Sequence, residues 1–255
     1  MTWARLLRAE VRKVTSTRMP WVFLAVLVTI AAITAGAVVW GTDFDGSKTF
    51  VSTAEDQRSL VAFAANATVL AGLFGALAVA REYAHQTTIP TFLSSPRRHR
   101  AVLAQYGAIA LAGALIGLAG AGLTVAGTAA ALPTTEFGFL IPASGVVQVL
   151  AAATYAGAAG AVLGAGIGAV VRNPGGAVTG TVLALIVAPP LIVQLVNDAA
   201  PWVPAPLASA LSGVDAASAG MESLAGATAA IVVLLLWALL PAVAGLLSVQ
   251  RRDVA

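Results

Sequence analysis

The amino-acid sequence predicts an all-α integral membrane protein with six transmembrane helices. Composition is the first reason: 59% of the 255 residues are hydrophobic and 10% are charged, whereas soluble domains carry about 25% charged residues. The second reason is that six apolar segments are each long enough to cross the hydrocarbon core, which takes about 20 residues of helix. Lipid offers no partner to a backbone amide, so a spanning segment must satisfy its own hydrogen bonds, as a helix does.

The N-terminal 19 residues predict an amphipathic helix that lies in the cytoplasmic membrane interface. Apolar side chains recur there at helical spacing and cations cover much of the remaining surface, which is typical of interfacial helices. The apolar positions are Trp3, Leu6, Leu7, Val11 and Val14, and the cations are Arg5, Arg8, Arg12 and Lys13. The alternative is a cleaved signal peptide with Ala35-Gly36-Ala37 as its cleavage site. The apolar run after residue 20 is about 20 residues long, however, against roughly 7–15 in a signal peptide.

Residues 20–255 are expected to form a single transmembrane domain. Pro20 can begin the first span because its missing amide donor costs little at a helix start, and Trp21 and Trp40 are placed as interfacial anchors. Between spans five and six, residues 198–223 predict two short re-entrant helices in the outer interface. The six spans are predicted at residues 21–41, 59–80, 101–131, 144–171, 177–196 and 224–249.

Glycines and prolines distinguish the fourth and fifth spans. Gly160, Gly164 and Gly168 are spaced by four, which leaves one helix face bare, so that another helix can approach it closely. The glycines from residue 164 to residue 168 resemble a phosphate-binding loop, but such loops follow a strand and open a helix. Pro189-Pro190 is expected to break or kink the fifth span.

The charges predict an orientation. Twelve of the 14 cations fall at the two termini, in the segment Arg81–Arg100 and at Arg172, which the six spans place on one side. Lys48 and Arg58 fall on the other side, together with eight of the 11 acids. Positively charged loops stay in the cytoplasm. Both termini and the Arg81–Arg100 segment are therefore expected to be cytoplasmic, in a bacterial cell membrane.

The Arg81–Arg100 segment is a polar stretch between long apolar runs, and it contains a short predicted helix. Pro90 fits only a first helical turn, so this helix is expected to begin near Ile89. Ile89, Phe92 and Leu93 then form an apolar knob that has no obvious internal core. Exposed apolar patches usually mark a partner surface, so the segment is a candidate docking loop.

The charged side chains of this loop admit more than one interpretation. Arg97, Arg98 and Arg100 are candidates to pair with acids on a partner or with anionic lipid, or they set only the topology. Glu82 follows the second span directly, where a carboxylate without a partner is costly. Its candidate partners are amides at the start of the short helix, or a cation from Arg97, Arg98 or the N-terminal helix; the alternative is a solvated acid.

Several kinds of chemistry are missing from the sequence. No Walker-type glycine loop ends in Lys-Ser or Lys-Thr, so the chain is not expected to hold ATP in that way. His85 and His99 are 14 residues apart in one loop and are expected to be solvated, since metal sites need more ligands. There is no cysteine for a disulfide or a thiolate metal site, and no predicted span contains a carboxylate. Neither a catalytic function nor a metal or cofactor in this chain is therefore expected, and the membrane pattern of the cations argues against nucleic acid.

Neutral polar residues lie within the predicted spans. Most are expected to form hydrogen bonds between helices. A minority are candidates to line a pathway for a largely apolar substrate, and these are Asn66, Thr68, Gln148, Thr154, Tyr155 and Gln194.

The whole chain resembles the permease subunits of type-two ABC exporters. The resemblance rests on the basic interfacial helix, the six spans, and the residues Arg81-Glu82-Tyr83, Thr87-Thr88 and Phe92-Leu93-Ser94-Ser95-Pro96-Arg97-Arg98. In that family an Arg/Tyr-Glu pair ends the second span, and Gly-Thr or Thr-Thr, a short helix and Pro-x-Arg follow. This chain has Gln86-Thr87 where the family more often has Gly-Thr.

The resemblance implies a half-channel driven by a separate ATPase. Two permease copies, in a homodimer rather than a heterodimer, would each contact one of two ATPase subunits, which would bind ATP and Mg. The cargo would be a hydrophobic or amphipathic compound such as a drug, an antibiotic or a lipid. The alternatives are a membrane scaffold or assembly factor without transport, and an intramembrane enzyme. The resemblance implies ATPase coupling through Arg81, Glu82, Thr87, Thr88, Ile89, Phe92, Leu93, Pro96, Arg97 and Arg98.

Overall fold

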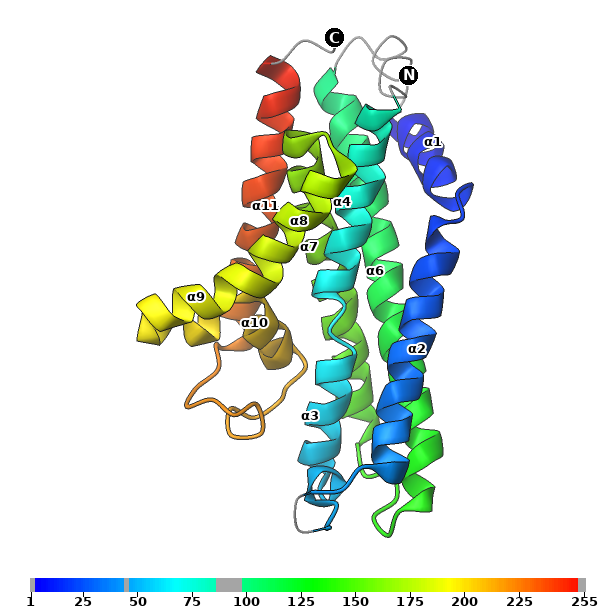
Figure 1. The fold of residues 1–255 in the computed structure, drawn as a ribbon, viewed down its shortest axis with the longest axis vertical. Coiled ribbons are helices and arrows are strands. Elements are labelled where there is room, and N and C mark those ends of the chain that lie inside the picture. Colours follow the sequence, from blue (N-terminus) through cyan, green and yellow to red (C-terminus); the bar gives the residue numbers. More distant parts are fainter. Residues whose placement is uncertain (1–2, 44–45, 86–97, 252–255) are drawn as a thin grey trace.

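The computed structural model describes residues 3–43, 46–85 and 98–251, and this part of the chain is all-helical. Six helical segments are long and apolar enough to cross a membrane, as predicted, and they mark a multi-pass membrane protein. The N-terminal helix α1, Trp3–Thr15, packs against α6 at one end of an elongated bundle (Figure 1). The long helices that follow are α2 (Met19–Trp40), α6 (Arg98–Ala131), α7 (Ala143–Val171) and α11 (Ala227–Arg251).

Helix α7 is the centre of the bundle because its glycines admit three neighbouring helices. The helix α4, Thr68–Ala84, lies so close that a side chain at Gly164 would collide with the carbonyl oxygen of Gly72. Gly160 and Gly168 meet α4 backbone in the same way, at Thr68 and Ala76. In the structure α4 is therefore the helix that covers the face on which these three glycines lie.

Glycines also allow close helix packing on two further faces of α7. Gly113 of α6 and Gly157 of α7 meet backbone to backbone, and Gly166 meets the backbone of Pro241 in α11. Small residues let helix backbones approach closely, which is how helices pack where the surrounding solvent is as apolar as their side chains. The fourth span is thus in contact with the second, third and sixth.

The second predicted span is interrupted, which corrects the single helix expected at residues 59–80. Helix α3, Ala54–Ala64, ends before Asn66, and α4 begins at Thr68. The Asn66 side chain accepts hydrogen bonds from the backbone amide of Thr68 at 3.2 Å and from its hydroxyl at 2.8 Å. Asparagine competes in this way for backbone donors that a continuous helix would use. At its other end α4 extends through Ala84, so Arg81 and Glu82 are helical rather than part of the loop.

The fifth predicted span changes direction near its prolines, as expected. It comprises α8 (Pro174–Val182), the π-helical turn η3 (Leu183–Val187) and α9 (Ala188–Leu195). Pro189 and Pro190 cannot donate to the preceding turn, and they occupy the start of α9, where that loss is tolerated. Figure 1 shows α9 projecting sideways from the long axis of the bundle.

The region between spans five and six is helical only in its first half. The 3-10 helix η4 (Asn197–Trp202) and α10 (Pro204–Leu211) are the two short helices. Residues 212–226, which follow α10, form turns and extended chain, with positive φ at Gly213 and Gly220. The remaining short elements are the 3-10 helices η1 (Thr49–Val51) and η2 (Leu132–Thr134).

The two ends of the bundle differ in charge. The ends of α4, α7 and α11 lie beside α1 and the start of α6, so the described cations other than Lys48 and Arg58 gather at this end, which we call the basic end (Figure 1). Lys48 and Arg58 lie near η1 and α3 at the opposite end. The predicted separation of the cations is thus present in the fold.

Candidate functional site

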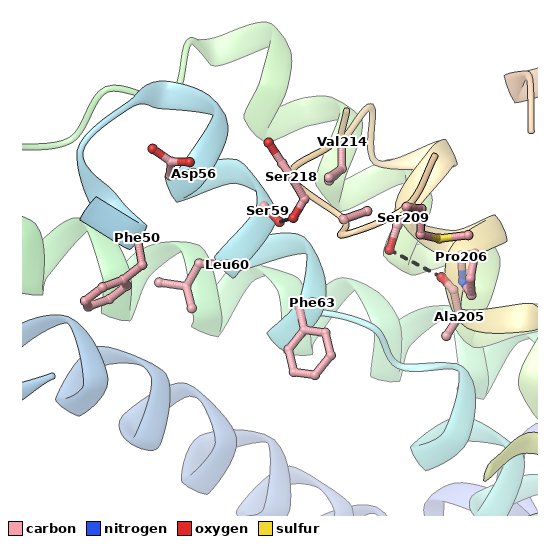
Figure 2. A pocket seen from close by; sticks show the side chains of 12 residues that line it. Phe50, Asp56, Ser59, Leu60, Phe63, Ala205, Pro206, Ser209, Val214 and Ser218 are labelled. Carbon is pink, nitrogen blue, oxygen red and sulfur yellow. Dashed lines mark hydrogen bonds between the residues drawn. The ribbon is translucent and has the colours of Figure 1, made fainter. Parts of the chain in front are cut away.

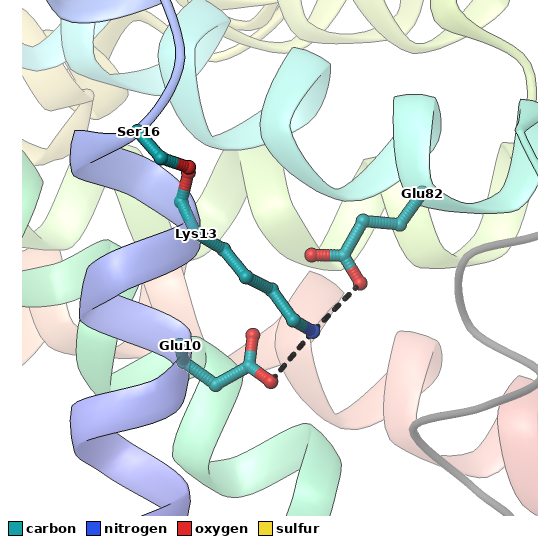
Figure 3. A network of polar contacts seen from close by, with 4 residues as sticks. All are labelled: Glu10, Lys13, Ser16 and Glu82. Carbon is teal, nitrogen blue, oxygen red and sulfur yellow. Dashed lines mark hydrogen bonds and ion pairs between the residues drawn. The ribbon is translucent and has the colours of Figure 1, made fainter.

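A polar cluster at the basic end joins α1 to the last turn of α4. The Lys13 ammonium lies 2.7 Å from Glu10 Oε1 and 3.5 Å from Glu82 Oε2 (Figure 3). The Gln105 side chain of α6 also lies close to the Glu82 carboxylate. One cation of the N-terminal helix is thus shared by two acids, one of which belongs to the second span. Of the partners considered for Glu82 from the sequence, the structure provides the cation of the N-terminal helix.

The two acids of this cluster are largely buried, so each needs a partner for its charge. Glu10 is 5% exposed and lies on the same face of α1 as buried Leu6, and the Glu82 side chain is 19% exposed. Taking a carboxylate out of water is costly unless a charge or a donor accompanies it. Lys13 supplies that charge to both acids at once, so the position of α1 against α4 depends on it.

The next residue of α4, Tyr83, contacts Arg172 at the end of α7. The Arg172 guanidinium lies over the Tyr83 ring, 5.1 Å from its centroid, which is cation–π geometry. Arg172 also donates from Nη2 to the Ser248 carbonyl oxygen of α11 at 3.2 Å. Arg172 ends α7 in the left-handed conformation, with φ of 57°, where non-glycine residues are uncommon. Two successive residues of α4 therefore contact α1, the end of α7 and, through Arg172, α11.

The residues implied in ATPase coupling are only partly described. Arg81 is exposed in the last turn of α4, Glu82 is in the cluster, and Arg98 begins α6. The predicted short helix and the seven other residues lie outside the described residues and stay predictions. Those seven are Thr87, Thr88, Ile89, Phe92, Leu93, Pro96 and Arg97.

Three of the six candidate pathway residues form structural hydrogen bonds within or next to their own helix. Asn66 binds Thr68 at the helix break and borders a small cavity of about 20 Å³ that Thr124 also lines. The Thr154 hydroxyl donates to the Leu150 carbonyl of α7 at 2.7 Å. Asn66 at the helix break, Thr68 of α4 and Thr154 of α7 are not brought together around one large cavity.

The other three candidates lie at different places in the bundle. The Tyr155 hydroxyl donates to the Ile231 carbonyl of α11 at 2.7 Å, the kind of bond between helices that the sequence led us to expect. Gln148 binds the Leu211 carbonyl at 3.2 Å, near the end opposite the basic end. Gln194 is exposed on α9. The six residues are therefore not gathered at one place in this chain, and their role in a substrate pathway stays a prediction.

A cavity of about 470 Å³ lies at the end opposite the basic end, between α3, η1, α10 and the turns that follow α10 (Figure 2). Its wall combines apolar side chains, among them Phe50, Leu60 and Phe63, with the Ser59 hydroxyl and the Asp56 carboxylate. Asp56 also caps α3, since its Oδ2 accepts from the Thr53 amide at 3.1 Å and the Thr53 hydroxyl at 2.6 Å. None of the six predicted pathway residues lines this cavity.

Side chains of α3 form the hydrogen bonds that fix the segments around this cavity. These residues were not identified from the sequence as part of a site. Arg58 donates from Nε to the Ser212 carbonyl at 2.8 Å and from Nη2 to Gln148. Glu55 accepts from the Asp215 amide at 2.8 Å. The fully buried Gln57 donates to the carbonyls of Val51 and Gly138, at 3.0 and 2.9 Å. The signal in the sequence was the row of polar residues from Glu55 to Ser59 at the start of an apolar helix.

Within the described residues, no group of three or more histidine, cysteine or acidic side chains is placed to hold a metal ion. When the chain is compared with models of known protein families and with curated proteins, nothing matches.

Proposed function

We propose that this chain is the transmembrane subunit of an ATP-binding-cassette exporter, and that a separate ATPase drives it from the basic end. Two copies would form the substrate pathway in a bacterial cell membrane, with both termini in the cytoplasm. The support from the fold is the set of six apolar helical segments and the gathering of cations at one end. Positive loops stay in the cytoplasm, where ATP is available.

The observation that carries the proposal is the Lys13–Glu82 contact at the foot of the loop between α4 and α6. A docking loop can move a membrane helix only if the two are joined rigidly. Glu82 lies in the last turn of α4, which ends at Ala84. Its carboxylate is held to α1 by the contact with Lys13. A force on the loop would therefore reach α4 and α1 together.

The packing of α4 supports the next step of the same mechanism. Because α4 lies backbone to backbone against α7 along three glycines, it has little room to slide alone. A displacement of α4 would move α7, and α7 contacts α6 and α11 closely. The cargo would pass between two such copies as a hydrophobic or amphipathic compound.

The experiment that tests the proposal is purification of the tagged chain from its native membrane. We expect an ATPase to co-purify at one copy per copy of this chain, and the assembled complex to hydrolyse ATP. The purified chain alone should not hydrolyse ATP, since it has no Walker-type loop. A chain that purifies reproducibly without an ATPase, or with non-enzymatic partners only, would favour a membrane scaffold or assembly factor instead.

A further inference from the structure

An apolar groove of about 460 Å³ runs along the bundle between α1, α2 and α6. Two of its wall residues have polar side chains, Thr15 and Thr154, and both hydroxyls donate to carbonyls of their own helices, at 3.1 and 2.7 Å. The groove therefore offers its occupant no unsatisfied hydrogen-bonding group. The largest share of its wall comes from α6 between Ala108 and Ala119, and the rest includes Val11 and Val14 of α1 and Leu24 and Leu27 of α2.

The length and position of the groove fit one lipid chain. It begins beneath α1 at the basic end and follows α6 from Ala108 to Ala119, roughly 16 Å at about 1.5 Å per residue. One leaflet of the hydrocarbon core is about half of 30 Å thick. The groove thus spans the depth of the leaflet on the side of α1, parallel to the helices.

Two arginines of α1 lie next to the end of the groove that is beneath α1. Arg8 and Arg12 are exposed on α1 and are helical neighbours of Val11 and Thr15, which line the groove. Arg8 and Arg12 also line a shallow depression on the polar face of α1. Among the described residues, no carboxylate lies within salt-bridge distance of either guanidinium, whereas Lys13 is already paired with Glu10 and Glu82.

We propose that this groove binds one anionic phospholipid, with an acyl chain between α2 and α6 and the phosphate against Arg8 and Arg12. The lipid would fill the space under α1 and so hold α1 in the position that the Lys13–Glu82 contact requires. Basic residues at a membrane surface attract anionic lipid with about 1 kcal/mol each, and the apolar wall adds a place for the chain that a flat helix surface lacks. The proposal requires only that the chain spans a membrane, and it does not depend on an ATPase partner.

The test uses the full chain, purified in a mild detergent with whatever subunits accompany it. Native mass spectrometry measures the retention of added phosphatidylglycerol and of phosphatidylcholine with the same acyl chains. We expect one tightly retained phosphatidylglycerol per chain. Arg8→Gln and Arg12→Gln should each reduce its preference over phosphatidylcholine by about fivefold, which corresponds to about 1 kcal/mol per charge. Arg81→Gln, an exposed cation at the same end that does not border the groove, is the matched control and should leave the preference unchanged.

A second variant tests the groove separately from the charges. Ala112→Phe places a ring in the groove and should reduce retention of both lipids, whereas Leu240→Phe, on an exposed face of α11, should not. Equal retention of the two lipids by the wild type would overturn the proposal, as would unchanged preference in the arginine variants. Efficient disulfide cross-linking of two Leu115→Cys copies would also overturn it, because a second copy would then cover the groove.

Discussion

Glu82 Oε2 lies 3.5 Å from the ammonium of Lys13, so that the last turn of the second span is joined to the N-terminal helix. Lys13 also binds Glu10 at 2.7 Å. The contact connects residues 69 positions apart in the sequence, and Glu82 lies in the last turn of α4. It is the feature on which the proposed coupling depends, and it can be tested first as a source of stability.

Lys13→Met should lower the free energy of unfolding by about 1–3 kcal/mol, because it leaves two largely buried acids without their shared cation. Thermal unfolding in detergent measures the change. Adding Glu82→Gln to Lys13→Met should recover part of the loss, since it removes one of the two unpaired charges. Arg100→Met, at an exposed position of the same end, should change stability by no more than about 0.5 kcal/mol. Equal effects of Lys13→Met and Arg100→Met would mean that the cluster contributes nothing.

Gly164→Leu should destabilise the bundle strongly, because a side chain there collides with the backbone of Gly72 in α4. Gly122→Leu is the matched control, since a side chain at Gly122 of α6 meets nothing within 4 Å. The melting temperature and the oligomeric state in detergent should change for the first variant and stay close to the wild type for the second. An unaltered Gly164→Leu protein would show that α4 and α7 are not packed as described.

Much of the fold follows from the sequence. Long apolar segments predict spans because the length needed to cross the bilayer is fixed, and the four-residue spacing of Gly160, Gly164 and Gly168 predicts a close helix contact whatever its partner. The break at Asn66 was not predicted. Ala65 and Ala67, on either side, favour helix strongly, and the interruption depends on one side chain competing for the Thr68 amide.

The candidate site was less predictable than the fold. The sequence placed Glu82 beside the basic loop, but its contact with Lys13 depends on how α1 packs against α6, which is a tertiary contact. Gln148 is polar within an apolar helix and was a candidate for the pathway. In the structure Gln148 accepts a hydrogen bond from Arg58 and donates one to the Leu211 carbonyl. Composition cannot separate these two uses, because both need a polar side chain on a spanning helix.

Arg58→Met should loosen the turns that form one wall of the cavity at the end opposite the basic end. The variant loses the bonds to the Ser212 carbonyl and to Gln148, so backbone amides of residues 212–221 should exchange with deuterium faster. Amides of α7 should exchange as in the wild type. Glu136→Gln, at an exposed position near η2, is the control and should leave exchange of residues 212–221 unchanged. Unchanged exchange in Arg58→Met would mean that these turns are held by other contacts.

A cysteine at Glu136 should react with an impermeant thiol reagent in intact cells, whereas a cysteine at Arg100 should react only after lysis. The natural chain has no cysteine, so each variant carries a single thiol. Both positions are exposed, and they lie at opposite ends of the bundle. The reverse labelling pattern would place the basic end outside the cytoplasm and would exclude an ATPase partner there.

The measurement that tests the coupling proposal most directly is dye efflux by Glu82→Ala in proteoliposomes that contain the chain and its co-purifying ATPase. A lipophilic fluorescent dye exported by the wild type serves as cargo, and Glu222→Ala, an exposed acid outside the cluster, is the control. We predict that Glu82→Ala retains the ATPase at wild-type stoichiometry but loses at least 90% of efflux, while Glu222→Ala transports normally. Normal efflux by Glu82→Ala, with the ATPase bound, would contradict the proposed role of the Lys13–Glu82 contact.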